Sequence, residues 1–325
     1  MKLTAFFICG LLVAAGVARA QNRNIYFLKN SGKEVEHRDS ADYIRIIEEP
    51  DTGSVYFPVT EVYANQQRKF IGQVSSFEPS LIYEGATLSY YANGKKKQQV
   101  TYEKGWPTGL AYYFDINGKP RKIVEYGEEG MERFLGIGRI VKFKVVSVLD
   151  STGVEMVTNG NGTAYEYSEE DLVREEGTYV NGVKQGRWSG ADLKRNITFQ
   201  EIYESGKLVK GTSVRSSGET YEYNKLEKLP EFKGGADAFN RFLSQTIRYP
   251  PEARSNGITG RVFLQFVIAA DGSVQDVEVV GAVHPLLDRE AASVMKRSPR
   301  WIPATQKGIP VKVMYRMPIN FQLGR

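Results

Sequence analysis

Apolar residues occupy every second position near the end of the chain. The apolar positions are Val311, Val313, Tyr315, Met317, Ile319 and Phe321, and the positions between them are Lys312, Met314, Arg316, Pro318, Asn320 and Gln322. A period of two predicts a β-strand with one apolar face and one mostly polar face. Because proline has no N–H and outward-facing cations discourage self-pairing, Pro318, Lys312 and Arg316 predict an edge strand.

The segment before this strand predicts a small α+β fold. Apolar residues at helical spacing indicate a helix over 236–247, which Tyr249-Pro250-Pro251 ends. Strands are expected over 260–269 and 274–280, joined by a turn at Asp271-Gly272, and a second helix begins at Pro285. The sequence therefore predicts two helices on a three-stranded antiparallel sheet in residues 229–325.

Residues 21–228 instead predict an all-β region of repeated hairpins. Asn93-Gly94-Lys95 recurs as Asn117-Gly118-Lys119, and Thr101–Gly105 has a counterpart in Thr178–Gly182. Asn-Gly between strand-like segments is typical of tight hairpin turns, because both residues adopt positive φ there. The paired glycines near Leu229–Gly235 mark the expected boundary to the terminal domain.

The first twenty residues have the pattern of a signal peptide. Lys2 precedes an apolar run from Leu3 to Val17, and Ala18-Arg19-Ala20 fits a cleavage site. Secretion is predicted over an uncleaved membrane anchor, since the run is short for a bilayer span. Cleavage would remove Cys9, the single cysteine, and with it any disulfide or cysteine-based metal site. We predict no metal and no cofactor.

No catalytic motif is present, so the protein is predicted not to be an enzyme. Its two histidines, His37 and His284, lie far apart in sequence, and no phosphate-binding or nucleophile motif occurs. Residues 231–325 hold 13 Lys and Arg against 8 Asp and Glu, a net charge of +5. This surplus favours acidic partners or is an ordinary solvated surface, and no basic aromatic stripe indicates nucleic acid.

Several motifs in the terminal segment resemble the C-terminal domain of the TonB family. They are Arg248-Tyr249-Pro250-Pro251-Glu252-Ala253-Arg254, Gly257-Ile258-Thr259-Gly260, Asp271-Gly272-Ser273-Val274 and Pro299-Arg300-Trp301-Ile302-Pro303. The hairpin region similarly resembles arrays of MORN-type repeats.

The TonB resemblance implies binding rather than catalysis. It implies a periplasmic protein that captures an extended segment of TonB-dependent outer-membrane receptors along its last strand, in energy-coupled transport across the membrane. The residues that would bind the peptide are Val311, Lys312, Val313, Met314, Tyr315 and Arg316. Arg248, Tyr249 and Pro250 are a second candidate contact, or simply a helix stop. An uncleaved N-terminus would imply contact with an inner-membrane proton-channel complex as well.

Two alternatives remain open at this point. The protein is a cell-envelope scaffold if the repeats bind the partner while the terminal domain forms a homodimer or caps the array. In the other alternative it is an enzyme whose site the sequence does not reveal.

Overall fold

The computed structural model describes residues 23–78, 80–134, 138–168 and 172–323. The chain divides into two compact units between Gly118 and Lys119. The predicted signal peptide, residues 1–20, lies outside the described residues. Among the residues that are described, no helix has the length and apolar character needed to cross a membrane.

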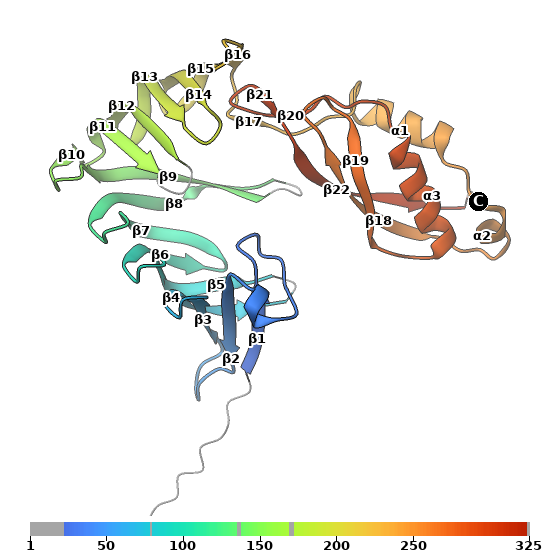
Figure 1. Cartoon of the computed structure of the whole chain (residues 1–325), viewed down its shortest axis with the longest axis horizontal. Helices are drawn as coiled ribbons and strands as arrows, with labels where there is room; N and C mark the ends of the chain where they lie inside the picture. Colours follow the sequence, from blue (N-terminus) through green and yellow to red (C-terminus); the bar gives the residue numbers. More distant parts are fainter. Residues whose placement is uncertain (1–22, 79, 135–137, 169–171, 324–325) are drawn as a thin grey trace, which may run out of the picture. The chain divides into compact units, whose positions relative to one another are not determined.

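The first unit is a series of antiparallel strands in which each strand pairs with the next along the chain (Figure 1). Ile47, Val59 and Val74 form a buried cluster on three neighbouring strands. A short 3-10 helix, η1, covers Arg38–Ser40. The strands are β1 (Arg23–Leu28), β2 (Tyr43–Glu48), β3 (Phe57–Tyr63), β4 (Arg68–Ser76), β5 (Ile82–Tyr90), β6 (Lys96–Glu103) and β7 (Trp106–Phe114).

The second unit begins with further antiparallel strands in chain order. They are β8 (Pro120–Phe134), β9 (Gly138–Leu149), β10 (Glu155–Thr158), β11 (Asn161–Ser168), β12 (Val173–Val180), β13 (Val183–Asp192), β14 (Ile197–Glu204), β15 (Lys207–Arg215) and β16 (Thr220–Tyr223). We call β8–β16 the array. The prediction of a β-hairpin region is confirmed, whereas its assignment to MORN-type repeats stays a prediction.

Repeated turns stack on one another, as the sequence repeats suggest. The Asn65 side-chain amide donates to the Ala92 carbonyl at 2.8 Å, and Asn93 donates to the Ile116 carbonyl at 2.7 Å. Gly94 and Gly118 of the predicted Asn-Gly turns have positive φ of about 80°, but Asn93 and Asn117 do not. The expected positive φ at both turn residues is therefore wrong here, because these loops are longer than two residues and only the glycine occupies the left-handed region. Equivalent turns therefore hold their neighbours at a regular spacing.

One face of the array is packed with aromatic rings that lie over glycines, and we call it the inner face. A Cβ atom at Gly177 would lie 2.2 Å from the Trp188 ring, and one at Gly211 would lie 2.2 Å from the Tyr223 ring. Cross-strand pairing places Trp188, Glu201, Gly211 and Tyr223 in one row on this face. Only glycine leaves room for rings this close to the backbone.

The terminal region is α+β, as predicted. Strands β18 (Gly260–Ile268), β19 (Val274–Gly281) and β22 (Val313–Phe321) form an antiparallel sheet in the order β19-β18-β22. Helices α1 (Gly235–Thr246) and α3 (Pro285–Lys296) contribute Phe239 and Leu287 to the core that this sheet shares with them (Figure 1). A second small sheet joins β17 (Glu227–Lys228), β20 (Ala304–Gln306) and β21 (Ile309–Val311).

Two details differ from the sequence prediction. Proline ends the first helix as expected, but Pro251 also begins a short helix, α2 (Pro251–Ser255), because proline suits the first helical position. The predicted continuous strand from Val311 to Phe321 is also wrong at its start. Val311 closes β21, where it pairs with Ala304, and β22 begins only at Val313.

Candidate peptide-binding edge

Strand β22 is an edge of the terminal sheet. It pairs with β18 along its whole length, from Val313 opposite Ile268 to Phe321 opposite Gly260. Within the described residues, no other strand pairs with β22. Its outer side therefore offers backbone groups that are free of strand pairing, which is the requirement for adding a further strand.

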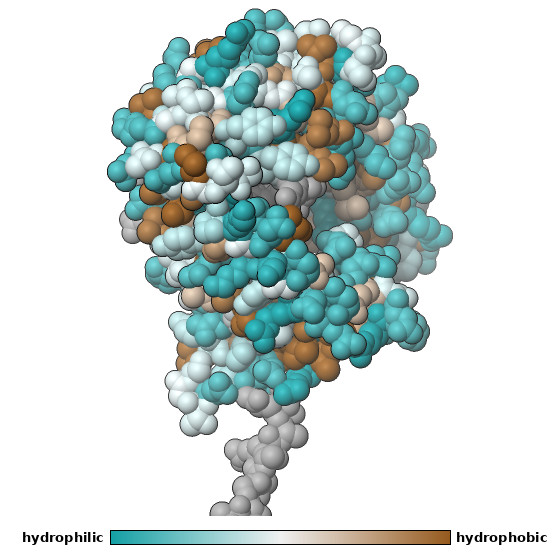
Figure 2. Space-filling view, turned by 60° about the vertical axis from the view of Figure 1, so that its left-hand side comes forward, coloured by the Kyte–Doolittle hydropathy of each residue, from teal (hydrophilic) through white to brown (hydrophobic). Residues whose placement is uncertain are grey.

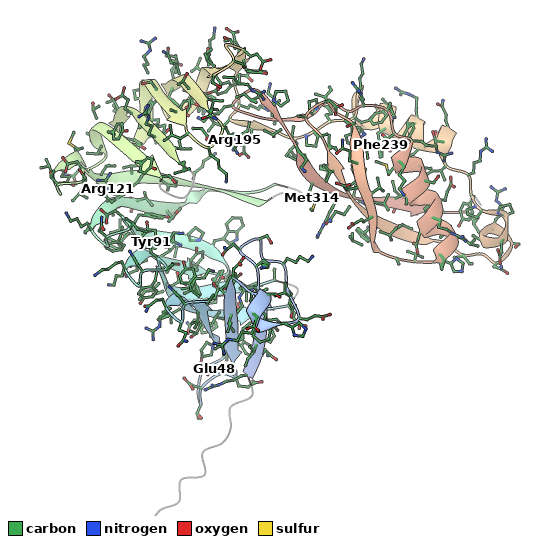
Figure 3. The ribbon with its side chains drawn as sticks, viewed as in Figure 1. Glu48, Tyr91, Arg121, Arg195, Phe239 and Met314 are labelled. Atoms are coloured by element: carbon green, nitrogen blue, oxygen red, sulfur yellow. The ribbon has the colours of Figure 1, made fainter. Side chains whose placement is uncertain are left out.

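The two faces of β22 match the alternation seen in the sequence. Ile319 and Phe321 are buried in the core, and Tyr315 and Met317 pack against it. The intervening residues are exposed, and Met314, which Figure 3 labels, is 61% exposed. Burial of one face fixes the register of β22 on β18 and leaves the other face open.

Polar side chains are held in place across the open face. Arg316 donates through Nε to Gln265 Oε1 at 2.6 Å, and Arg261 donates through Nε to Asn320 Oδ1 at 2.8 Å. Lys312, exposed between β21 and β22, adds a second cation near the start of the edge. The first half of β22 is thus basic as well as open.

The opposite edge, β19, is poorly suited to pairing with a peptide. Its register on β18 is irregular at two points, and Asp276 has a φ of 50°. Asp276, Glu278 and Lys296 line an open cavity of about 360 Å³ beside it. Bulges of this kind protect an edge from further strands, so β22 is the better candidate.

The structure separates the predicted peptide-binding residues into three groups. Val313, Met314, Tyr315 and Arg316 lie on the edge strand, Lys312 lies just before it, and Val311 belongs to β21. The core-facing side of Tyr315 packs near Trp301, with ring centroids 6.0 Å apart. The Tyr315 side chain is therefore turned toward the core and is not offered at the edge.

The second predicted contact, Arg248-Tyr249-Pro250, lies beside the other end of β22. The Tyr249 ring packs edge-on against Phe321 at 5.8 Å, and its hydroxyl donates to the Ile258 carbonyl. Arg248 donates through its backbone N–H to Glu290 Oε1 at 2.8 Å. These contacts account for Tyr249 as a packed helix stop and do not bring it to the basic half of the edge.

A contact that sequence reasoning missed joins the terminal region to the array. Lys307, in the turn between β20 and β21, pairs with Glu201 on β14, which is 0% exposed. Tyr223 and Tyr203 donate their hydroxyls to the same carboxylate at 2.7 and 2.9 Å. Burial opposes ionisation of Glu201, but the Lys307 ammonium and the two hydroxyls hold its pKa below the ordinary 4.5. Lys307-Gly308 is a turn signal like those of the array, and it was the available clue.

Other sites are less developed. Among the described residues, no cluster of His, Cys, Asp and Glu has the arrangement of a metal site. On the face that Figure 2 shows, apolar side chains are interspersed with polar ones.

Comparisons with known proteins match the terminal region. Residues 245–323 match the family model described as Gram-negative bacterial TonB protein C-terminal. Two proteins named Protein TonB, from two strains of Helicobacter pylori, are each 33% identical over 82 residues, which cover 25% of this chain and 27% and 28% of theirs. The solution structure of the Helicobacter pylori TonB C-terminal domain is 29% identical, covers 28% of this chain and 87% of that chain, and has a TM-score of 0.22. The chain thus spans about a quarter of the length of the curated relatives it matches.

Proposed function

Because residues 245–323 form a TonB C-terminal domain, we propose that this protein binds TonB-dependent outer-membrane receptors by adding a receptor segment to the edge of β22. The protein would act without covalent chemistry, in energy-coupled transport across the membrane. The observation that carries the proposal is the unpaired outer side of β22, which is basic at its start.

The direction of the backbone groups supports this choice of edge. In an antiparallel pair, residues alternate between exchanging hydrogen bonds with the partner strand and pointing their backbone groups away from it. Pro318, opposite Phe263, has no N–H and therefore suits a position whose backbone groups point away from β18. Met314 and Arg316 have the same parity, so their N–H and C=O groups would face an incoming peptide.

The charge near this edge favours an acidic peptide. Lys312 and Arg316 lie where the peptide would run beside the first half of β22. Exposed charges of this kind mainly raise the association rate and are screened by salt, whereas main-chain hydrogen bonds supply the binding itself. Binding should therefore weaken with salt but persist.

A proline substitution at Met314 tests the proposal. Met314→Pro removes one outward N–H while leaving the hydrogen bonds to β18, and Met314→Ala keeps that N–H while removing the side chain. Isotope-labelled full-length protein would be titrated with extended peptides from the N-terminal segments of the host's outer-membrane receptors. We expect amide shifts along 313–317, and affinity about tenfold weaker for the proline variant alone.

The control result decides between backbone and side-chain recognition. Equal losses in both variants would mean that the Met314 side chain, and not strand addition, makes the contact. A folded protein that shows no shifts at millimolar peptide would refute receptor binding at this edge.

The proposed location is the periplasm, with residues 1–20 acting as a cleaved signal. If they are cleaved, we propose that the protein acts as an adaptor or competitor at receptors. If they are retained, contact with an inner-membrane proton-channel complex becomes a further proposal. Mass spectrometry of the mature N-terminus distinguishes the two.

A second candidate function is favoured by the contact between Lys307 and Glu201. In this alternative the protein is an envelope scaffold, and the terminal domain caps the array. Met314→Pro would then leave association with the cell envelope unchanged, whereas loss of association with the envelope would count against the scaffold.

A further inference from the structure

The turn of the β20–β21 hairpin fits the inner face of the array closely. Lys307 Nζ lies 3.6 Å from the centre of the Phe199 ring while it pairs with Glu201. Its backbone N–H donates to the Leu226 carbonyl at 2.6 Å. One lysine from a distant part of the chain thus meets an aromatic ring and a buried carboxylate that also accepts from two hydroxyls.

The same arrangement occurs within the array itself. Lys184 pairs with Glu175 at 2.6 Å and lies 4.1 Å over the Trp188 ring. Lys122 pairs with Glu166 at 2.5 Å, and Tyr179 donates its hydroxyl to that carboxylate at 2.6 Å. Glu175 and Glu166 therefore each have a lysine from the array, and Glu201 receives its lysine from the terminal region.

The turn geometry repeats as well. Ser205 and Gly206, between β14 and β15, have φ of 48° and 78°, and Lys307 and Gly308 have the same two values. A Cβ at Gly206 would lie 3.0 Å from Val183 of the preceding hairpin, and one at Gly308 would lie 3.2 Å from Tyr221 on β16. The β20–β21 turn thus packs on the end of the array as each array turn packs on the hairpin before it.

The hairpin also leads directly into the candidate peptide-binding edge. Only Lys312 separates the end of β21 from the start of β22. Anything that immobilises β21 therefore restricts the backbone at the beginning of β22. A pre-ordered edge loses less conformational entropy when a peptide pairs with it.

We propose that Lys307 is a latch: it docks the β20–β21 hairpin on the array as a terminal repeat and thereby pre-orders the start of β22 for strand addition. The second part rests on the proposed function. Lys307 is a positioning residue, because it acts through β21 and does not itself touch the peptide. By linkage, a bound peptide strengthens the latch by the same factor that the latch strengthens peptide binding.

The latch is tested first without any peptide. Amide hydrogen exchange in the full-length protein would be compared between Lys307→Met and Lys225→Met, an exposed lysine in the loop after β16. Loss of the ammonium leaves Glu201 buried and uncompensated, so exchange in residues 304–311 and in β14 should quicken at least tenfold in Lys307→Met only. Equal exchange in the two variants would overturn the latch.

A double variant keeps the test decisive if Lys307→Met folds poorly. Glu201→Gln combined with Lys307→Met removes both charges, so the buried charge no longer opposes folding. We expect this variant to fold, with the array protected and residues 304–311 still exchanging quickly. Full protection of residues 304–311 in it would show that the ion pair does not hold the hairpin, and would overturn the latch.

Peptide titration then tests the coupling. Lys307→Met should bind the receptor peptides about five- to tenfold more weakly than Lys225→Met, at the lower end of usual coupling factors. Equal peptide affinities of the two variants would overturn the coupling. The hydrogen-exchange result alone would then decide whether Lys307 is a latch. Absence of peptide binding in the unmodified protein would refute the proposed function together with the coupling, again without deciding the latch.

Discussion

Gly177 provides a sharp test of how the array is packed. An alanine there would place its Cβ 2.2 Å from the Trp188 ring, whereas carbon atoms in contact lie about 3.5–4.0 Å apart. Trp188 is 0% exposed and also contacts Tyr179, with ring centroids 4.9 Å apart, so the ring has no free space to enter. Gly177→Ala must therefore displace the ring or the strand.

The size of the effect follows from three contributions. Overpacking of a core costs about 1–3 kcal/mol, and a shift of more than 1 Å puts this site near the upper value. The hydrogen bond from Trp188 Nε1 to the Thr178 carbonyl, 3.2 Å long, contributes about 1 kcal/mol that the shift would remove. Replacing glycine returns about 0.5 kcal/mol through the unfolded chain. We expect a net loss of about 3 kcal/mol.

Amide hydrogen exchange of β12 and β13 measures this loss of stability locally. A local measurement avoids treating the unfolding of a two-unit chain as one step. A loss of 3 kcal/mol corresponds to exchange about 100-fold faster across residues 173–192. Gly127→Ala on β8 is the matched control, because no described atom lies within 4 Å of its Cβ position. It should leave exchange unchanged or slightly slower, and a similar result for Gly177→Ala would refute the packing argument.

Two further predictions concern other parts of the second unit. Burial would raise the pKa of Glu166, but Lys122 and the Tyr179 hydroxyl hold it below the ordinary 4.5, so the stability that the carboxylate contributes is complete above pH 4.5 and is lost as the pH falls further. The melting temperature measured against pH should therefore decline less steeply below pH 4.5 in Glu166→Gln than in the unmodified protein. An unchanged slope would contradict this. Gly272→Ala should destabilise the terminal domain by about 2 kcal/mol more than Gly257→Ala. Both glycines have positive φ, but only at Gly272 would a Cβ meet the Trp301 carbonyl, at 2.0 Å. Equal melting temperatures for the two variants would rule out the steric contribution.

Much of the terminal domain follows from local pattern. Helical spacing identified α1, Pro285 marked the start of α3, and the Asp271-Gly272 turn joins β18 and β19 as expected. These features depend on neighbouring residues in the chain, so periodicity and turn chemistry are sufficient to find them.

Only part of the candidate peptide-binding edge could be predicted from the sequence pattern. Alternation identified which face of the last strand is buried, and Pro318 indicated an edge. It did not identify the break at Lys312, because β21 continues the same alternation while it pairs with β20 in another sheet. The lysine that completes the buried Glu201 site was not predicted either, since nothing in the sequence near Glu201 identifies a partner 106 residues away.

The sequence by itself therefore determined the strand and helix types, the turns, and which side chains face a core. Only the tertiary structure decided that β22 lies beside β18 with its other side open, and that Lys307 reaches Glu201. The physical reason is the range of the interactions. Period and propensity act within a few residues, whereas strand neighbours such as Arg261 and Asn320, 59 residues apart, are chosen by the packing of the whole domain.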